Sequence, residues 1–371
     1  MKLLKWLVFY FSKLSVIPHG KAYQKQVMEM ARTRHSGVSP LLKNSLCQHD
    51  CHSRYFLRRV WFLYNLASIF LLPVLMGVLL LRKSKDAKNP IANISLTGRF
   101  PEEVKKDFSP TYVKMPFGSL RARDYKYLRA ILLNSGFRPY FILRTVWKLG
   151  VYSDLVEIYS PSNVLVTQEM TFESSFLTQY LRDLGICHVN YMHGEKWFSM
   201  QDAFSSFEIA YVWEEFYKKL FEELGSDTKE YRFFKAIHPL PEPVTQLDAI
   251  TYYHQLSSSP KEFTAVLQNL EKFAHSHKCE LLVRLHPLQT KDYEVQMLRD
   301  RNIQQENVRE VSLEKSVTRC RYVCSESSSV LYQGSLLGKT LVVDNTFPER
   351  IDIYRDLDFI VLKKIEHIYL V

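Results

Sequence analysis

The stretch that decides the fold is SPSNVLVTQEMTFESSFLTQYLRDLGICHVNY, residues 160–191. Residues 164–166 form a short run of Val and Leu that predicts a strand. Residues 174–184 have the apolar spacing of a helix, which Gly185 ends, and residues 186–191 predict a second strand. A strand, a helix and a strand with short links indicate two parallel strands joined by a crossover helix.

The same alternation continues towards the C-terminus and is interrupted once, by the proline-rich link at residues 239–243. We therefore expect two Rossmann-like, doubly wound α/β domains that face each other across a cleft, at residues 91–240 and 245–371. Further strands are expected at residues 209–213, 249–253, 281–285, 308–311, 321–324 and 341–343, and further helices at residues 214–224, 261–275, 291–301 and 330–337.

The charge of the chain is unevenly distributed. Its 371 residues carry a formal net charge of +10, with 46% hydrophobic and 24% charged residues, which excludes a globally disordered chain. Residues 1–90 hold 15 Lys and Arg but only three acidic residues, so the remainder is close to neutral. A neutral body and a basic segment interleaved with apolar runs argue against nucleic-acid binding and favour an anionic membrane surface.

Residues 1–90 are expected to form a basic, apolar helical extension that associates with a membrane. Residues 3–17 combine lysines with aromatic side chains, as in a surface-seeking helix. Val60–Leu81 is uncharged, is bounded by basic pairs and is just long enough to cross a bilayer. Because both flanks are basic, we expect a peripheral or monotopic attachment at the cytoplasmic leaflet of a membrane. The alternative is a fully buried core helix.

Six cysteines in a chain of this length do not form a disulfide framework, and a reducing cytosol is the simpler interpretation. Cys47, His49, Cys51 and His52 are zinc-type ligands, but no second ligand pair is obvious at a distance. No Asp-x-Asp lies at a suitable strand end, so we expect no metal and no bound cofactor.

Three polar clusters follow predicted strands, where ligands bind in open α/β sheets. They are His193-Gly194-Glu195, Arg284-Leu285-His286-Pro287 and Glu326-Ser327-Ser328-Ser329. The serine run precedes a helix, so its hydroxyl and N–H groups predict a phosphate site, although serine also caps helices routinely. His286 is a candidate for assisting a departing phosphate, with Arg284 adding positive charge. The alternative is an ordinary turn residue.

His193-Gly194-Glu195 joins a titratable base, a flexible turn and a carboxylate. Either His193 or Glu195 fits a general base for an attacking hydroxyl, and the alternative is a surface loop with incidental polar residues.

Several of these motifs resemble those of known transferase families. Residues 164–213 are similar to the N-terminal domain of bacterial surface-polysaccharide glycosyltransferases of the two-Rossmann, or GT-B, type. Leu285-His286-Pro287 with the serine run resembles the HP and SS motifs of bacterial sialyltransferases and polysialyltransferases. Arg284-Leu285-His286-Pro287 and His193-Gly194 also resemble CDP-glycerol glycerophosphotransferases. Where the sialyltransferase pattern has an acidic pair before a glycine, this chain has Met192-His193, so Glu195 or Glu169 is a candidate for the missing carboxylate.

The resemblance implies transfer from a nucleotide-activated donor, with CMP as the leaving group. The expected function is a glycosyltransferase that moves a sugar such as sialic acid to a cell-surface glycan or a lipid-linked glycan by direct, inverting displacement. Transfer of glycerol phosphate or another polyol phosphate in capsule or teichoic-acid synthesis is one alternative. A non-catalytic, membrane-attached assembly protein is another.

Overall fold

The computed structural model describes residues 20–55, 58–82, 90–98, 100–255, 259–286 and 290–370, without the side chains of Arg58 and Arg59. The chain forms two compact units. The first contains Met1–His193 and Phe198–Phe234, and the second contains Gly194–Trp197 and Lys235–Val371. Among the residues described, the change of unit at Lys235 comes just before the proline-rich link at 239–243.

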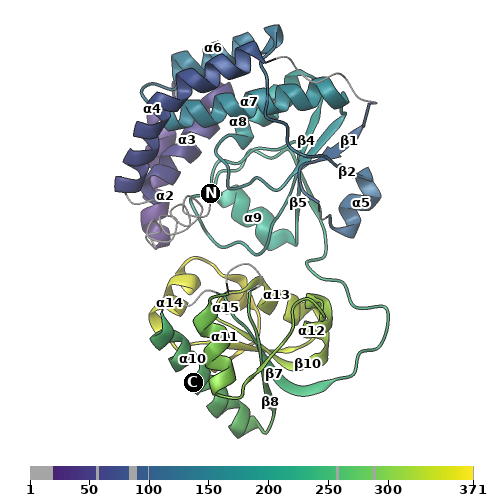
Figure 1. Cartoon of the computed structure of the whole chain (residues 1–371). Helices are drawn as coiled ribbons and strands as arrows, with labels where there is room; N and C mark the ends of the chain where they lie inside the picture. The colour runs from purple at the N-terminus through teal and green to yellow at the C-terminus, as the bar shows by residue number, and fades with distance from the viewer. Residues whose placement is uncertain are drawn as a thin grey trace. The chain divides into compact units, whose positions relative to one another are not determined.

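The first unit contains a fully parallel sheet with the strand order β2-β1-β3-β4-β5-β6. Its core lies between β1, β3 and the long helix α7, which is apolar on nearly all sides and therefore buried. The strands are β1 (Asn93–Ser95), β2 (Thr111–Tyr112), β3 (Asn163–Val166), β4 (Cys187–Tyr191), β5 (Ile209–Val212) and β6 (Glu230–Phe233). The helices are α5 (Glu102–Phe108), α6 (Tyr125–Asn134), α7 (Pro139–Tyr159), α8 (Ser174–Asp183) and α9 (Glu215–Glu223) (Figure 1).

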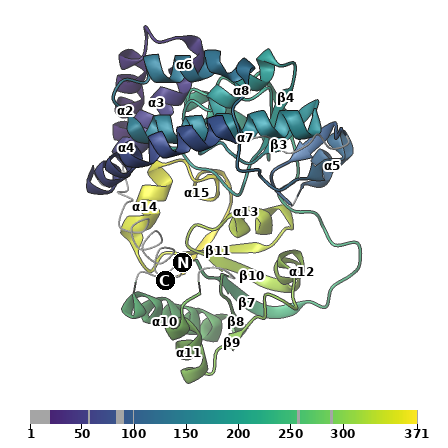
Figure 2. The same cartoon turned by 45° about the horizontal axis from the view of Figure 1, so that its top comes forward.

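The second unit contains another parallel sheet, with the order β12-β11-β10-β7-β8-β9, and Figure 2 shows its central strands side by side. Helices α10 and α11 pack together, as do α12 and α13, so that each sheet face receives its own helices. The strands are β7 (Leu247–Tyr253), β8 (Glu280–Arg284), β9 (Gln304–Gln305), β10 (Cys320–Ser325), β11 (Thr340–Asp344) and β12 (Ile368–Leu370). The helices are α10 (Pro260–His277), α11 (Asp292–Asp300), α12 (Leu313–Arg319), α13 (Ser329–Leu336), α14 (Pro348–Asp356) and α15 (Ile360–Lys364).

The two doubly wound α/β sheets confirm the predicted fold class and most of the strands and helices expected from residue 160 onwards. The prediction of a strand at residues 308–311 is wrong. These residues form a turn in which the Asn307 carbonyl accepts the N–H groups of Glu310 and Val311, at 3.2 and 3.0 Å. The edge strand is instead the polar pair Gln304–Gln305, which lies beside β8.

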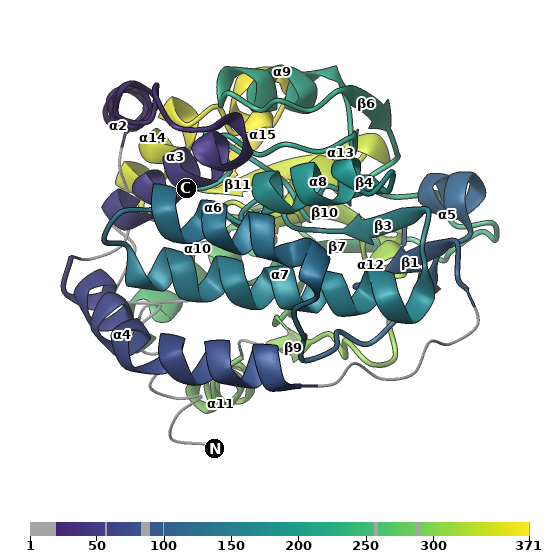
Figure 3. The same cartoon turned by 90° about the horizontal axis from the view of Figure 1, so that it is seen from above.

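Three N-terminal helices pack onto the first unit: α2 (Lys21–Arg34), α3 (Pro40–Tyr55) and α4 (Arg58–Leu81). Helix α3 lies against α8 and contributes Leu42 and Leu46 to the core, and α4 runs along α7 (Figure 3). They form the predicted helical extension. The helix predicted at residues 3–17 lies outside the described residues.

Helix α4 buries one side and exposes the other. Leu79 is fully buried against the core, whereas Phe62, Phe70 and Val74 are 63%, 71% and 64% exposed. Only 11% of its most apolar window is buried, so the alternative of a fully buried core helix is wrong. By length and composition, Val60–Leu81 is able to cross a membrane.

A close backbone contact fixes α4 in place. Gly118 has φ of +110°, and a Cβ atom there would lie 2.7 Å from the Gly150 carbonyl carbon in α7. The Ser119 N–H then donates to the Gly150 carbonyl at 3.2 Å, and the Leu120 N–H donates to the Leu79 carbonyl near the end of α4 at 2.9 Å. One loop therefore links the two helices through backbone atoms.

We expect Gly118→Ala to lower the free energy of unfolding by roughly 2–3 kcal/mol, because both the positive φ and the backbone clash oppose a side chain. Gly185→Ala is the control, since Gly185 has φ of +72° but no neighbour within 4 Å of the added Cβ. Urea unfolding of both variants checks this. Equal losses would show that the contact with α7 is not the cause.

Two buried histidines make the first unit sensitive to acid. Burial lowers the pKa of His188 to about 3 and that of His52 to about 4, from an ordinary 6.5. Below about pH 6.5 the unfolded chain therefore binds protons that the folded chain does not. Stability falls with decreasing pH by up to about 1.4 kcal/mol per pH unit for each histidine. We expect His188→Gln to flatten this slope between pH 6.5 and 4 in urea unfolding, whereas an unchanged slope would contradict it.

Candidate functional site

The strongest candidate site is a cavity of about 350 Å³ in the second unit, which we call the β7–β10 pocket. The strand order reverses between β7 and β10, and loops that leave a parallel sheet in opposite directions open a crevice at such a point. The pocket lies at the carboxyl ends of β7, β8, β10 and β11. Its lining residues are Tyr252, His254, Gln255, Glu262, Val266, His286, Glu326, Phe347, Arg350 and Tyr354.

An ion-pair network forms one side of the β7–β10 pocket. The Arg350 guanidinium lies 2.9 Å from the Glu262 carboxylate and 3.3 Å from the Glu326 carboxylate, and it stacks over the Phe347 ring at 4.4 Å. The Tyr354 hydroxyl donates to Glu326 at 3.4 Å. Burial raises the pKa of Glu326 although Arg350 opposes the rise. The network thus offers carboxylate acceptors held in fixed positions.

His254, directly after β7, is a second feature of the pocket. Its Nε2 lies 3.1 Å from the buried Glu294 carboxylate and donates to it. Within the described part of the chain, Nδ1 is buried without a hydrogen-bond partner. A buried polar nitrogen that lines a cavity is suited to a hydrogen bond with a ligand.

His286 lines the same pocket, as its place after β8 predicts. Burial lowers the pKa of its imidazole. The ring is therefore neutral near pH 7 and offers one N–H donor and one acceptor nitrogen. Pro287, the next predicted site residue, lies outside the described residues.

The serine run reaches the pocket through one member. The buried Ser327 hydroxyl donates to Gln255 at 3.0 Å, and Gln255 lines the pocket. Ser328 caps α13, with its hydroxyl oxygen accepting the Val330 N–H at 3.4 Å, and Ser329 is the first helical residue. Capping accounts for Ser328. The first-turn N–H groups of α13 begin three residues after Glu326, a pocket residue.

Arg284, predicted as part of the phosphate site, is not among the residues that line the pocket. Its guanidinium pairs with the buried Glu306 carboxylate and donates to the Val311 carbonyl at 3.0 Å. Arg319 also binds Glu306, at 2.7 Å. Arg284 therefore holds the turn after β9 against β8.

The His193 turn belongs to the carboxyl edge of the first sheet. Gly194 has φ of +70°, and the His193 N–H donates to the buried Glu169 carboxylate at 3.1 Å. Asn190 donates to the other Glu169 oxygen at 3.2 Å, so Glu169 supports the turn. His193 itself is exposed. The buried Glu195 belongs to the second unit, in the short segment Gly194–Trp197.

Sequence reasoning missed His254, Glu262, Arg350 and Tyr354. His254 carries the same signal as His286, a histidine directly after a strand, and could have been found by it. Glu262, Arg350 and Tyr354 lie on α10 and α14, and their meeting depends on how two helices pack.

No family model and no curated protein matches the chain. Solved structures similar to it include UDP-GlcNAc 2-epimerase from Neisseria meningitidis bound to UDP-GlcNAc, with 11% identity, 71% of this chain and 85% of that chain covered, and a TM-score of 0.41. LpCGTa in complex with UDP has 10% identity, coverage of 76% and 84%, and a TM-score of 0.42. The glycosyltransferase of kitacinnamycin has 10% identity, coverage of 72% and 74%, and a TM-score of 0.39. Likeness at this level identifies neither the reaction nor the substrate of this chain.

We expect Arg284→Gln to destabilise the second unit by about 2 kcal/mol, because it leaves the buried Glu306 with one cation instead of two. Arg321→Gln is the control: Arg321 pairs with Asp248 at 3.0 Å, but both side chains are more than half exposed. Solvent screens that exposed pair, so its loss should change the stability little. Urea unfolding measures both, and equal stability of the two variants would contradict a structural role for Arg284.

Proposed function

We propose that the protein is a glycosyltransferase that uses a nucleotide-activated sugar, and that the β7–β10 pocket holds the nucleotide. The observation that carries the proposal is the convergence of His286, His254 and Glu326 with Arg350 on one cavity at the crossover point of a doubly wound sheet. Such crevices bind nucleotides, and a volume of about 350 Å³ is within the range of small-ligand pockets.

The chemistry of the pocket suits the parts of a nucleotide. The Glu326 and Glu262 carboxylates are acceptors for ribose hydroxyls, and Phe347 with Tyr252 supplies aromatic surface. Arg350 is already balanced by two carboxylates, so we assign the phosphate elsewhere. We place the phosphate at the start of α13, where the N–H and hydroxyl groups of Ser329 and the positive end of the helix dipole favour an anion.

In the proposed reaction, an acceptor hydroxyl oxygen attacks the anomeric carbon while the bond from that carbon to the phosphate oxygen breaks. The hydroxyl proton passes to a general base, and the nucleotide leaves with the bonding electrons. The His286 N–H donates a hydrogen bond to the departing phosphate, where negative charge develops. His193 and Glu195 remain the candidate bases. Glu169 is less suited, because its oxygens already accept from His193 and Asn190.

The finer parts of the proposal rest on the motifs alone. Leu285-His286-Pro287 and the serine run favour a CMP-linked donor such as a sialic acid donor, a surface-glycan or lipid-linked acceptor, and a reaction without a metal. The exposed apolar face of α4 supports attachment to a membrane, and the resemblance to bacterial transferases favours the cytoplasmic face of a bacterial inner membrane.

Transfer of glycerol phosphate from a CDP-linked donor is the second candidate. The observation that favours it is His193-Gly194, which lacks the acidic pair of the sialyltransferase pattern. Mass spectrometry of the product distinguishes the two, because one reaction adds a sugar and the other adds a phosphodiester-linked polyol.

We expect His286→Ala to lower kcat/KM by roughly 100-fold or more, because it removes a donor to the leaving phosphate. The full-length protein is screened against CMP-, UDP- and GDP-linked donors, and the variant is assayed on the accepted donor. His275→Ala is the matched control, since His275 lies exposed on α10 and does not line the pocket.

Near-normal turnover of His286→Ala would overturn the role of His286. Calorimetry tests the wider proposal. Absence of binding to CMP, UMP and GMP at millimolar concentration would favour a non-catalytic assembly protein.

A further inference from the structure

The first unit contains a groove of about 880 Å³ between α4, the segment that starts α7, and helices α2 and α3. We call it the α4 groove. Phe62, Leu66 and Ile69 of α4 form its apolar side, together with Phe137, which is 87% exposed. Arg34, Asp50, Arg54 and Arg138 also line it, together with His49.

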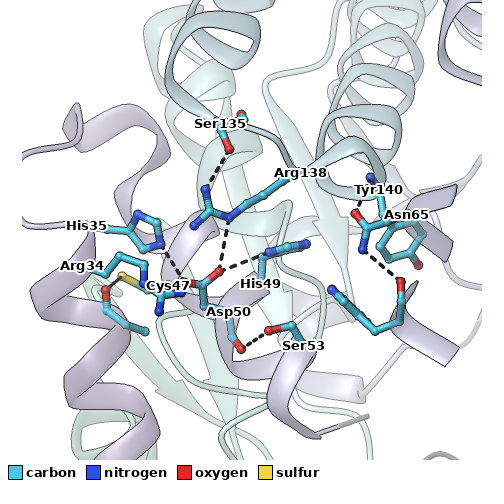
Figure 4. A network of polar contacts seen from close by, with 12 residues as sticks. Arg34, His35, Cys47, His49, Asp50, Ser53, Asn65, Ser135, Arg138 and Tyr140 are labelled. Atoms are coloured by element: carbon cyan, nitrogen blue, oxygen red, sulfur yellow. Dashed lines mark hydrogen bonds and ion pairs between the residues drawn. The ribbon is translucent and has the colours of Figure 1, made fainter. Parts of the chain in front are cut away.

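Three arginines form the opposite side of the α4 groove. Arg34 and Arg138 lie 2.9 and 3.3 Å from the two oxygens of Asp50, as Figure 4 shows. Arg54 is exposed and has no ion pair among the described residues. Because three guanidinium groups are balanced by only one carboxylate, the polar side of the groove has a net positive charge.

Asp50 orients the arginines. His35 Nε2 lies 3.1 Å from Asp50 and His49 Nδ1 lies 3.6 Å from it, and the carboxylate is mostly buried. Burial would raise the pKa of Asp50, but its contacts with His35, His49 and Arg138 hold it far below the ordinary value. The carboxylate is therefore ionised and fixes one edge of the Arg34 and Arg138 guanidinium groups. Arg138 also donates to the Ser135 carbonyl at 2.9 Å, which leaves Arg34 and Arg54 as the main donors for an anion.

His49 provides an independent indication of a ligand. Its ring is 3% exposed and lies among Trp61, Phe141 and Phe172, at centroid distances of 5.0 to 5.3 Å. Within the described part of the chain, its Nε2 is buried and has no hydrogen-bond partner. His49 lines the groove, and a buried nitrogen that lacks a protein partner is a position where a bound water or a polar group of a ligand forms a hydrogen bond.

We propose that the α4 groove binds the phosphate head of an anionic lipid, with the lipid chain lying along the exposed face of α4. Arginine forks match phosphate, and the large apolar side chains next to them match a hydrocarbon chain. A soluble nucleotide would leave Phe62, Leu66 and Phe137 in water. The same chemistry is present in a bilayer phospholipid and in a lipid that carries a glycan on a phosphate.

This inference rests on the proposed membrane attachment and is independent of the reaction in the second unit. The charge around the groove agrees with it, because the described part of residues 20–82 contains only Glu29 and Asp50 as acidic residues. A second copy of the chain would bring the same positive groove against its own and is disfavoured.

The test is flotation of the full-length protein with vesicles of phosphatidylcholine, of phosphatidylcholine with phosphatidylglycerol, and of phosphatidylcholine with polyprenyl phosphate. We expect stronger binding to both anionic mixtures than to the neutral vesicles. Arg54→Gln should weaken binding to the anionic mixtures by about fivefold, the effect of one basic residue at a membrane surface. Arg309→Gln is the matched control, because Arg309 is exposed in the second unit.

Phe62→Ser combined with Phe70→Ser should abolish binding to all vesicles, whereas Phe233→Ser, at a residue 48% exposed on β6, should not. Equal binding to neutral and anionic vesicles, or equal effects of Arg54→Gln and Arg309→Gln, would overturn the phosphate site.

Inorganic phosphate that releases the protein from both anionic mixtures would support the phosphate site. A preference for polyprenyl phosphate would assign the groove to a lipid-linked substrate, and equal anionic binding would assign it to the bilayer.

His286→Ala should bind vesicles like the wild-type protein. Failure of the transferase proposal would therefore leave the vesicle result unchanged, and failure of the vesicle test would leave turnover unchanged.

Discussion

Parallel pairing of β7 with β10 is the contact on which the candidate site depends. Tyr252 lies opposite Cys324 in this pair, and the chain leaves the two strands at the same edge of the sheet. Right-handed crossovers then carry α10 and α13 to opposite faces, so the loops after the two strands separate and leave a crevice. Neighbouring β8 and β11 bring His286 and α14 to that crevice. Strand order thus brings the loops after β7, β8, β10 and β11 to one place, although these strands lie far apart in the sequence.

The strands and helices with strong local patterns could be predicted from the sequence. Residues 164–166, 281–283 and 341–343 are runs of β-branched and aliphatic residues, and each lies in a strand. The edge strands β2, β6, β9 and β12, and β1 beside β2, are two to four residues long and have no such pattern. Helix α7 escaped prediction because a helix that is apolar on nearly all sides has no periodicity to detect.

The candidate site was predictable only where it follows the ends of strands. His286 and Glu326 come directly after β8 and β10, and both line the pocket. Arg284 satisfies the same local rule but is paired with Glu306, which reaches it from a loop that no sequence pattern connects to β8. Arg350 and Glu262 meet across two helices, and such a contact depends on tertiary packing.

Helix α3 contacts both the α4 groove and the residue that supports the His193 turn. Gln48 donates to the Glu169 carbonyl at 2.8 Å, and the next two residues, His49 and Asp50, line the α4 groove. The Glu169 side chain supports the backbone of His193. One turn of helix α3 therefore joins the proposed lipid site to the turn that carries a candidate base. A short, stiff spacer of this kind would act as a ruler, which selects acceptors by how far their reactive end extends from the bilayer rather than by every sugar along their length.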